Sequence, residues 1–385
     1  MKTLRVGLIG HKFMGRVHTH AYTDMPIFFR SDIQVIKRTL CSNEDSAGDV
    51  YKAWGFEKWV RDWRDVVNDT DIDIVDIAAP SAIHAAIAIA AAKAGKHVFC
   101  EKPLALTLQD AKRMRDAVKA AGVVNMIGFN YRRVPALALA RQLIDEGRIG
   151  EVYHFRGVYE QSWLIDPAFP LAWRLKRSEA GYGTHGDMGA HVIDLVRFLV
   201  GEIGAVLCRQ KTFIKQRPIP LASDGLSAVA GDEMGMVDVD DASQMMLAFR
   251  DSNAMGYIEV TRYGTGHRNK NRIEISGSKG ALIFDMENMN ELQFYDTSDA
   301  AHIQGFRRIQ VGEGVHPYMA SWWPAGHIIG YGDTFVNQVY DFLTAVSRGE
   351  MVRPDFEDGL MCQRVLEAAQ ISSADQAWVD IDMVG

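Results

Sequence analysis

The chain has 385 residues and a formal net charge of −7, and 48% of its residues are hydrophobic while 24% are charged. This length exceeds one ordinary domain of about 100 to 200 residues and predicts two lobes with a cleft, and the composition is typical of a soluble globular protein. The acidic balance supplies no basic face for a phosphate backbone, which argues against nucleic acid as a partner and favours a small molecule.

The four cysteines are scattered along the chain and form no CxxC pair. This spacing argues against a disulfide framework and against a thiolate metal site, and it fits a reducing compartment. The first apolar run is too short for a secretory signal, and no run of about 18 apolar residues follows that would span a membrane. We therefore expect a cytoplasmic protein that does not insert into membranes.

The first part of the chain alternates short apolar runs with helical stretches, a rhythm typical of βαβ units and a parallel sheet. Helices are predicted at 82–94 and at 108–121, the second with Thr107 as its N-cap and Gly122 at its end. The strands are nearly all apolar, so we expect both faces of the sheet to be buried. They are predicted at 6–9, 34–40, 74–78, 97–100 and 124–127. We interpret residues 1–128 as a Rossmann-like, dinucleotide-binding α/β domain.

From residue 129 onward the pattern changes. A helix to about Glu146 leads into runs with a period of two, which is the pattern of strands with one buried face. Turn residues such as those at 277–280 separate the runs, so a large, mostly antiparallel sheet is predicted. Its strands are expected at 152–161, 244–250, 255–262, 272–276, 281–285, 291–295 and 307–311. We interpret residues 129–385 as an α+β domain for substrate binding and oligomerisation.

Three more helices are predicted in this second domain, at about 188–200, 334–347 and 357–369. The stretch from 217 to 241 is punctuated by Gly, Pro and Asp, and it is predicted to be a long surface loop or an interface element.

A glycine-containing turn follows the first strand, in the sequence Gly10-His11-Lys12-Phe13-Met14-Gly15. A dinucleotide fingerprint belongs at this place, between a strand and a helix. Gly10 suits the tight turn and Gly15 suits close packing, but Lys12 replaces the glycine that lets the backbone approach a pyrophosphate. Three interpretations stay open: Lys12 turns outward, its ammonium binds the diphosphate, or the segment is a βα turn without a ligand.

The end of the second strand usually carries an acidic residue that binds the ribose of NAD. Here Cys41 and Ser42 occupy that place, and such neutral side chains neither favour NAD strongly nor repel the 2′-phosphate of NADP. The choice between NAD and NADP stays open, with NAD as our first expectation. Pro80 and His84 follow the strand at 74–78, at the sheet edge where ligands bind in open α/β folds.

Glu101-Lys102-Pro103 follows the apolar strand at 97–100 and is delivered to the same edge. A lysine at a strand end, followed by a proline that fixes the chain direction, lies at the mouth of a cleft and not on a solvated helix face.

A second polar cluster lies at the start of the helix predicted near 188. Asp187 and His191 are four residues apart and share one helix face, where a carboxylate orients an imidazole for proton transfer from a hydroxyl. Two alternatives stay open: a capping Asp beside a packed His, or a metal site formed by these two residues with His185 and Asp194. No HxxxH-type spacing supports the metal, so we expect none.

Three motifs together resemble the Gfo/Idh/MocA oxidoreductase family, and the resemblance spans essentially the whole chain. They are the turn from Gly10 to Gly15 followed by Arg16-Val17-His18, the EKP motif at 101–103, and the GDxGxHxxD motif at 186–194. The resemblance implies a catalytic trio of Lys102, Asp187 and His191. His191 would act as acid and base, Lys102 would polarise the reacting oxygen near the nicotinamide, and Asp187 would hold the substrate.

The resemblance also implies two sets of binding residues. Cofactor contacts are expected from Gly10, Lys12, Phe13, Met14, Cys41, Ser42, Pro80, His84, Glu101, Lys102 and Asn130. Substrate contacts are expected from Tyr131, Gln161, Trp173, Arg174, Asp187, His191 and Asp333. Asp333 has a second interpretation, as a cap of the helix predicted from Thr334.

The expected activity is the reversible, NAD(P)-dependent oxidation of a ring hydroxyl, namely the 3-hydroxyl of a sugar, glycoside or anhydrosugar bound between the lobes. An inositol dehydrogenase, a redox-neutral NAD-dependent glycosidase or lyase, and a non-catalytic sugar sensor are the alternatives. We expect a homodimer or homotetramer, because the second domain would expose one face of its sheet.

Overall fold

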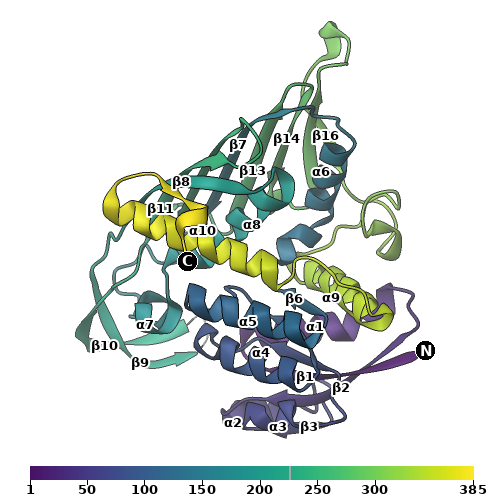
Figure 1. The fold of residues 1–385 in the computed structure, drawn as a ribbon, viewed down its shortest axis with the longest axis vertical. Helices are drawn as coiled ribbons and strands as arrows, with labels where there is room; N and C mark the ends of the chain where they lie inside the picture. The colour runs from purple at the N-terminus through teal and green to yellow at the C-terminus, as the bar shows by residue number, and fades with distance from the viewer. Residues whose placement is uncertain (225–226) are drawn as a thin grey trace. The chain divides into compact units, whose positions relative to one another are not determined.

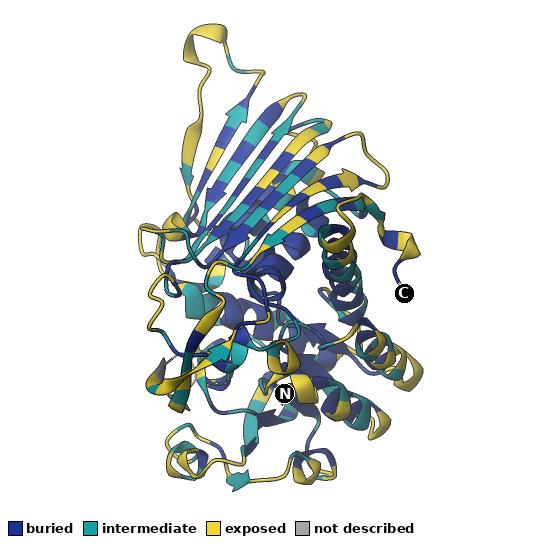
Figure 2. Cartoon of the chain, turned by 90° about the vertical axis from the view of Figure 1, so that its left-hand side faces the viewer, coloured by how far each residue is buried: buried dark blue, intermediate teal, exposed yellow. Residues whose placement is uncertain are grey.

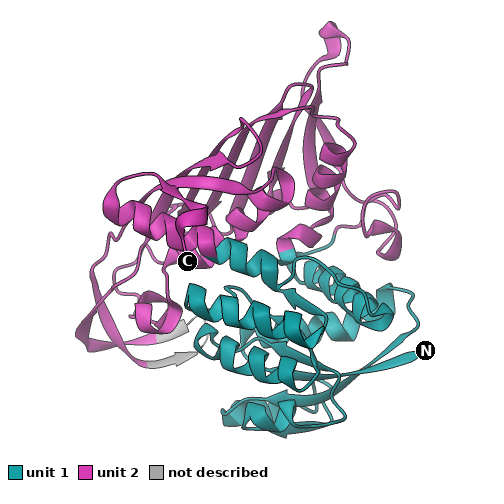
Figure 3. Cartoon of the chain, in the orientation of Figure 1, with its two compact units in different colours: residues 1–130, 329–363 teal, residues 131–328, 364–385 magenta. Residues whose placement is uncertain are grey.

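The computed structural model describes residues 1–224 and 227–385. The chain divides into two compact units (Figure 3), one made of residues 1–130 and 329–363 and the other of residues 131–328 and 364–385. The first unit therefore differs from the expected domain 1–128 by residues 129–130 and by a segment from near the end of the chain, residues 329–363. This segment includes α9 (Tyr331–Arg348), which packs on α1 (Phe13–Phe28) and stacks Tyr340 on Phe29 at 4.3 Å between ring centroids.

A six-stranded parallel sheet forms the centre of unit 1 (Figure 1), in the order β3-β2-β1-β4-β5-β6. Its strands are β1 (Lys2–Ile9), β2 (Ile33–Cys41), β3 (Lys58–Val60), β4 (Ile74–Ile77), β5 (His97–Cys100) and β6 (Asn125–Ile127). The Rossmann-like fold is confirmed, with strand order reversing between β1 and β4. The short strand β3 was not predicted, because its three residues are only partly buried and carry no apolar run.

The helices of unit 1 follow the βαβ rhythm, and α4 and α5 lie side by side (Figure 1). They are α1, α2 (Asp45–Val50), α3 (Trp63–Val67), the 3-10 helix η1 (Ser81–Ile83) with α4 (His84–Lys93), α5 (Leu108–Ala121) and α9, and α10 (Phe356–Asp375) begins in this unit. The predicted ends of α5 are confirmed. The Thr107 hydroxyl accepts a hydrogen bond of 3.1 Å from the Asp110 amide, and Gly122 closes the helix at φ +64°.

Unit 2 contains a nine-stranded sheet in the order β16-β15-β14-β13-β7-β12-β11-β8-β17. The strands are β7 (Val152–Glu160), β8 (Ile203–Lys211), β11 (Ala242–Phe249), β12 (Met255–Thr261), β13 (Lys270–Gly277), β14 (Gly280–Asp285), β15 (Glu291–Asp296), β16 (Arg307–Gln310) and β17 (Val379–Asp380). The prediction of a large, mostly antiparallel sheet is confirmed, since only β7 and β12 pair in parallel. Figure 2 shows the buried and less buried rows that alternate along these strands.

Helices α6 (Pro135–Asp145) and α8 (Ala190–Leu199) pack on this sheet, α6 against β14 and β15 and α8 against β7. The helix predicted from Met188 begins earlier, as a π-helix at His185–Gly189 that continues into α8. Its start is set by Asp240, whose carboxylate accepts hydrogen bonds from the amides of Gly183 and His185 at 3.0 and 2.7 Å. The remaining short helices are η2 (Asn130–Arg133), η3 (Trp173–Leu175), α7 (Arg177–Ala180), η5 (Met286–Asn288), η6 (Ala301–Ile303), η7 (Met319–Ser321) and η8 (Ile381–Met383).

The prediction of a long loop at 217–241 is wrong. Strands β9 (Gln216–Asp224) and β10 (Ser227–Met236) pair there as an antiparallel ribbon, and residues 225–226 of the predicted loop lie outside the described residues. Pro218 and Pro220 favour a loop in sequence, but a two-stranded ribbon has only edge strands, which tolerate proline. Two irregularities of register in β10 also break the period of two.

Across the part of the chain that the structure describes, none of the helices has both the length and the apolar character needed to cross a membrane.

Candidate active site

The turn after β1 is built on two glycines that have no room for a side chain. Gly10 has φ +111°, and a Cβ added to it would lie 2.3 Å from the carbonyl oxygen of Ala78, just after β4. A Cβ on Gly15 would lie 2.1 Å from the carbonyl oxygen of Gly10. Both glycines therefore have the packing roles predicted for them, at the point where the strand order reverses and ligands bind in such sheets.

The amino end of α1 fits the diphosphate of a dinucleotide. Its N-cap residue is Lys12, whose side chain makes no capping hydrogen bond, and its first turn, with Phe13 and Met14, holds no acidic residue. The first amides of a helix have no partner within the helix, and together with the helix dipole they attract an anion. Lys12 Nζ lies 2.6 Å from Glu44 Oε2, so the lysine of the fingerprint is engaged with the residue that precedes α2.

The end of β2 presents neutral groups, as predicted from the sequence. Cys41 is buried, and burial raises the pKa of its thiol to about 12, which keeps it uncharged near neutral pH. Ser42 accepts a hydrogen bond from the Glu44 amide at 3.3 Å. Glu44, the acidic residue nearest in the sequence to this strand end, was not predicted as a site residue.

A buried cluster of charged groups contacts the backbone at Lys102. His18 of α1 lies with Nδ1 2.8 Å from Asp76 Oδ1 and with Nε2 3.0 Å from Glu101 Oε1. Glu101 Oε2 in turn accepts a hydrogen bond of 3.2 Å from the Lys102 amide. Burial alone would lower the pKa of His18, but the two carboxylates outweigh it and raise the pKa to about 10, so the imidazole is charged. The sequence offered two signals for this cluster: a histidine in the family-like turn motif, and a carboxylate within the apolar strand β4.

His84 joins the loop after β4 to the loop after Lys102. His84 is 1% exposed, and its Nε2 lies 2.9 Å from the Ala79 carbonyl oxygen while Nδ1 lies 3.1 Å from the Pro103 carbonyl oxygen. Burial lowers its pKa, which favours the neutral ring. Its contacts thus hold the two loops that flank the expected nicotinamide region, where Pro80 precedes η1.

Two further predicted residues lie at the start of α9 or beside it. Asp333 accepts a hydrogen bond of 2.7 Å from the Gly330 amide, which is the contact of a helix cap, so the second interpretation of this residue has direct support. Asn130 donates a hydrogen bond of 2.8 Å to the Thr334 hydroxyl, and both are buried. Unit 1 contains all of the predicted cofactor residues and Asp333.

Unit 2 contains the other predicted substrate residues, and it places Asp187 and His191 on successive turns. Asp187 lies in the π-helix and is 35% exposed, while His191 lies in the first turn of α8 and is 8% exposed. Single π-helical turns inside helices are frequent at functional sites, because they change which side chains share a face. The His191 ring lies 4.5 Å from the Tyr131 ring, measured between centroids.

A chain of hydrogen bonds extends from Tyr131 along the ends of the neighbouring strands. The hydroxyls of Tyr131 and Tyr159 are 2.8 Å apart, and Tyr159 donates to Asn269 Oδ1 at 2.8 Å. The same oxygen accepts from Gln161 Nε2 at 2.9 Å, and Trp163 Nε1 donates to Gln161 Oε1 at 2.9 Å. The structure therefore fixes the orientation of the predicted residue Gln161. Asn269 and Trp163 were not predicted, because no local pattern marks them.

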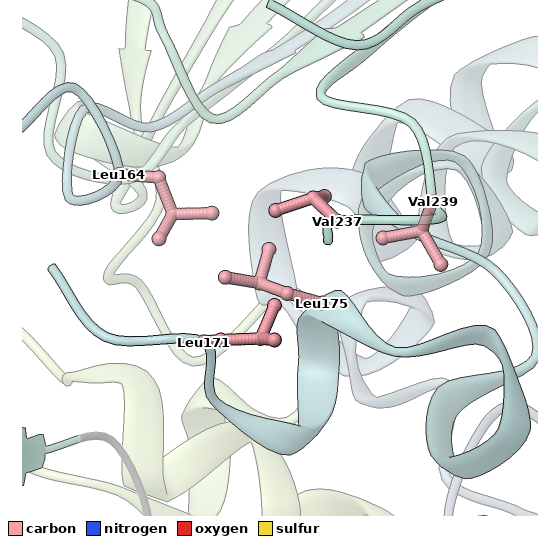
Figure 4. Packing of buried hydrophobic residues seen from close by; sticks show 5 residues of the cluster. All are labelled: Leu164, Leu171, Leu175, Val237 and Val239. Atoms are coloured by element: carbon pink, nitrogen blue, oxygen red, sulfur yellow. The ribbon is translucent and has the colours of Figure 1, made fainter. Parts of the chain in front are cut away.

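The loop that carries Trp173 and Arg174 is held by a small apolar cluster (Figure 4). Its members are Leu164, Leu171, Leu175, Val237 and Val239. The Arg174 guanidinium lies 4.3 Å from the Trp173 ring centroid. Burial lowers the pKa of Arg174, while the charge of Asp187 opposes that shift. Arg174 and Asp187 are therefore electrostatically coupled.

Asp194, one of the four residues considered as metal ligands, forms a buried ion pair with Arg132. Arg132 binds it with two hydrogen bonds, Nε to Oδ2 at 2.9 Å and Nη2 to Oδ1 at 2.6 Å, and both side chains are buried. His185 lies with Nε2 2.9 Å from the Leu366 carbonyl oxygen. Among residues 1–224 and 227–385, no group of three or more His, Cys, Asp or Glu side chains has the arrangement of a metal site.

Comparisons with known proteins agree with this architecture. Residues 4–129 match the oxidoreductase family with an NAD-binding Rossmann fold, and residues 137–283 match the GFO/IDH/MocA C-terminal domain. Levoglucosan dehydrogenase of Pseudarthrobacter phenanthrenivorans is 44% identical over 390 residues, which cover 100% of both chains.

Solved structures give the same result. The crystal structure of an oxidoreductase domain protein from Kribbella flavida has a TM-score of 0.94 at 46% identity and covers 99% of this chain and 100% of its own. Levoglucosan dehydrogenase in complex with NADH and levoglucosan has a TM-score of 0.93 at 42% identity, over 99% of this chain and 100% of its own. The NAD-binding description agrees with the first expectation for the cofactor. The chain belongs to the Gfo/Idh/MocA family of NAD-binding oxidoreductases.

Proposed function

We propose that this protein oxidises a ring hydroxyl of a sugar, glycoside or anhydrosugar with NAD, and that the 3-hydroxyl is the reacting group. The observation that carries the proposal is the placement of Asp187 and His191 on successive turns, in a unit whose hydrogen-bonded chain from Tyr131 to Asn269 also orients the amide of Gln161. A carboxylate, an imidazole and a fixed amide suit a polyhydroxylated neutral substrate. The likeness to a levoglucosan dehydrogenase over the full chain supports the same substrate class.

Oxidation of a carbinol removes a proton from the hydroxyl and a hydride from the same carbon. NAD supplies the hydride acceptor when it is bound. His191 accepts the hydroxyl proton, Asp187 holds the substrate, and Lys102 polarises the oxygen. Tyr131 lies against His191 and is not a competing base, because burial raises the pKa of its phenol and keeps it protonated.

Recognition of the sugar rests on the aromatic and amide groups of unit 2. The indole faces of Trp163 and Trp173 suit the C–H bonds of a sugar ring, and Gln161 reads a hydroxyl. Because Gln161 Oε1 already accepts from Trp163 and its Nε2 donates to Asn269, its remaining hydrogen-bonding capacity has a fixed direction. A fixed donor or acceptor discriminates well between hydroxyl stereoisomers, since a mismatch leaves a buried polar group unpaired.

The proposed form in the cell is a cytoplasmic homo-oligomer. The four cysteines are all free and buried, which suits a reducing compartment. Met246 of β11 and Met255 of β12 are 45% and 59% exposed on the sheet of unit 2, and a second copy would cover such apolar groups. Light scattering of the purified protein tests this, and a monomer at micromolar concentration contradicts it.

The experiment that tests the function measures NADH and NADPH formation with inositols, aldoses, glucosides and anhydrosugars. We expect NADH with glucosides or anhydrosugars. Activity restricted to inositols supports an inositol dehydrogenase. NAD that copurifies and never accumulates as NADH supports a redox-neutral glycosidase or lyase. Sugar binding without any turnover supports a sensor.

The catalytic assignment is tested with Lys102→Ala and His191→Ala. Each is expected to lower turnover by at least about a hundredfold, a typical contribution of acid-base catalysis. Lys119→Ala, at an exposed position of α5, and His302→Ala, at an exposed position of η6, serve as controls with wild-type turnover. Near-wild-type activity in either test variant contradicts the assignment.

A further inference from the structure

Arg262 is a buried cation that follows β12 and contacts Asp187. Strands β7 and β12 are parallel, so their carboxyl ends deliver Gln161 and Arg262 to the same edge of the sheet of unit 2. The backbone amide of Gln161 donates a hydrogen bond of 2.9 Å to the Thr261 carbonyl oxygen, which places the two chain segments side by side. Arg262 Nη2 donates to Asp187 Oδ2 at 2.7 Å.

Arg262 is much more deeply buried than the carboxylate with which it pairs. Its side chain is 1% exposed, whereas that of Asp187 is 35% exposed. The guanidinium carbon lies 5.5 Å from the ring centroid of Trp163, which itself bonds to Gln161. Nε and Nη1 are buried and find no acceptor among the residues that the structure describes.

This arrangement is a poor device for stability. Burying a guanidinium and leaving two of its nitrogens without acceptors costs free energy that one ion pair with a partly exposed carboxylate does not recover. An apolar side chain of similar length would fill the same space without that cost. A buried arginine at this position is explained if the orientation of the Asp187 carboxylate matters, because a rigid guanidinium restricts the carboxylate that it binds to one orientation.

We infer that Arg262 is the positioning residue of this site, which anchors Oδ2 of Asp187 and thereby sets the orientation of the carboxylate that binds the sugar. The inference rests on the proposed function, since it needs Asp187 to bind substrate. Arg262 acts through Asp187 and through the Trp163 face it packs under, and it does not touch the reacting atoms. Arg174 is a third charged group near this pair, because the charges of both Asp187 and Arg262 affect its pKa.

The test is a double-mutant cycle in the full-length enzyme with the best sugar of the panel. Arg262→Met is expected to lower kcat at least about tenfold, because a misplaced catalytic group loses much of its contribution. NADH affinity, measured by fluorescence titration, is expected to stay within about twofold of wild type, because the predicted cofactor residues are in unit 1. In the Asp187→Asn background the same substitution is expected to lower kcat by less than about twofold, since the residues act as one unit. Arg262→Lys, which keeps the charge, is expected to recover part of the loss.

Arg197→Met is the matched control. Arg197 is also buried, with its side chain 2% exposed, and it pairs with Glu202, whose side chain is 38% exposed, at the far end of α8. This variant is expected to keep wild-type kcat.

Four results overturn the inference. The inference is refuted if Arg262→Met lowers kcat by the same factor in the wild-type and Asp187→Asn backgrounds, or if Arg262→Met keeps wild-type kcat. In both cases the proposed function stands. Should Arg262→Met not fold, wild-type kcat and sugar KM in both Arg262→Lys and Arg262→Gln refute it equally. A wild-type enzyme that binds NADH but oxidises no sugar refutes the proposed function first, and the role of Arg262 falls with it.

Discussion

His18 and Glu101 are joined inside unit 1 by a contact of 3.0 Å between Nε2 and Oε1, with both side chains almost completely buried. They are 83 residues apart in the chain. The charged His18 ring holds the carboxylate that receives the Lys102 amide, so a residue of α1 supports the end of β5. The lysine of the EKP motif thus depends on a contact that the motif itself does not contain.

The first prediction concerns the pH dependence of stability. The pKa of His18 is about 10 in the folded chain, above its value of 6.5 in an unfolded one, because the two carboxylates outweigh burial. Its stabilisation is therefore complete below about pH 6.5 and is lost as the pH rises towards about 10. We expect His18→Gln to be less stable than wild type in urea unfolding at pH 7, with the difference shrinking towards pH 10. His302→Gln, at an exposed position, is the control, and a difference independent of pH contradicts the prediction.

The second prediction concerns the dinucleotide turn. Gly10→Ala combines a positive φ with a Cβ 2.3 Å from the Ala78 carbonyl oxygen. The loops after β1 and β4 must separate, so we expect NADH binding at least about tenfold weaker in a fluorescence titration. Gly122→Ala is the matched control, because its φ of +64° carries the same kind of strain while nothing lies within 4 Å of the added Cβ. It is expected to lose about 1 kcal/mol of stability and no NADH affinity. Equal NADH affinity in both variants argues against the turn as the cofactor site.

The third prediction concerns the buried pair of Arg132 and Asp194. Removal of one partner leaves an uncompensated buried charge, so we expect Arg132→Met to lower the free energy of unfolding by about 3–5 kcal/mol. The exposed pair of Arg113 and Asp110 is the comparison, and Arg113→Met is expected to cost less than about 1 kcal/mol. Chemical denaturation measures both. An Asp194 that instead served a metal would make stability rise on addition of zinc, which we do not expect.

The fourth prediction concerns Asn269. Its Oδ1 accepts hydrogen bonds from both Gln161 and Tyr159, so Asn269→Ala removes the contact that orients the Gln161 amide, which we propose binds a sugar hydroxyl. We expect KM for the sugar to rise at least about fivefold with kcat within about twofold, because binding of ground state and transition state is lost equally. Asn269→Asp retains an acceptor and is expected to keep KM near wild type. Should both variants behave alike in steady-state kinetics, the oxygen of Asn269 has no such role.

Local sequence patterns were sufficient to predict the helix α5, the strand β5 and most strands of the large sheet. The limits of α5 follow from a Thr cap and a terminal glycine, and the end of β5 follows from three apolar residues before a polar turn. The strands of the large sheet alternate with a period of two, as in β11. In contrast, β9 and β10 contain proline and register irregularities, so pairing between the two strands, and not the pattern of either one, makes them strands.

The candidate site also has residues that local sequence patterns predict and residues that they do not. Local sequence patterns are sufficient to predict the chemistry that we propose, since Lys102 lies just after a strand and Asp187 lies four residues before His191. The contacts that support these groups appear only in the tertiary structure. His18 contacts both Asp76 and Glu101, Gln161 donates a hydrogen bond to Asn269, and Arg262 donates one to Asp187. The physical reason is distance along the chain. A hydrogen bond between residues 58 to 108 positions apart depends on strand pairing and helix packing, and no periodicity or spacing of residues predicts it.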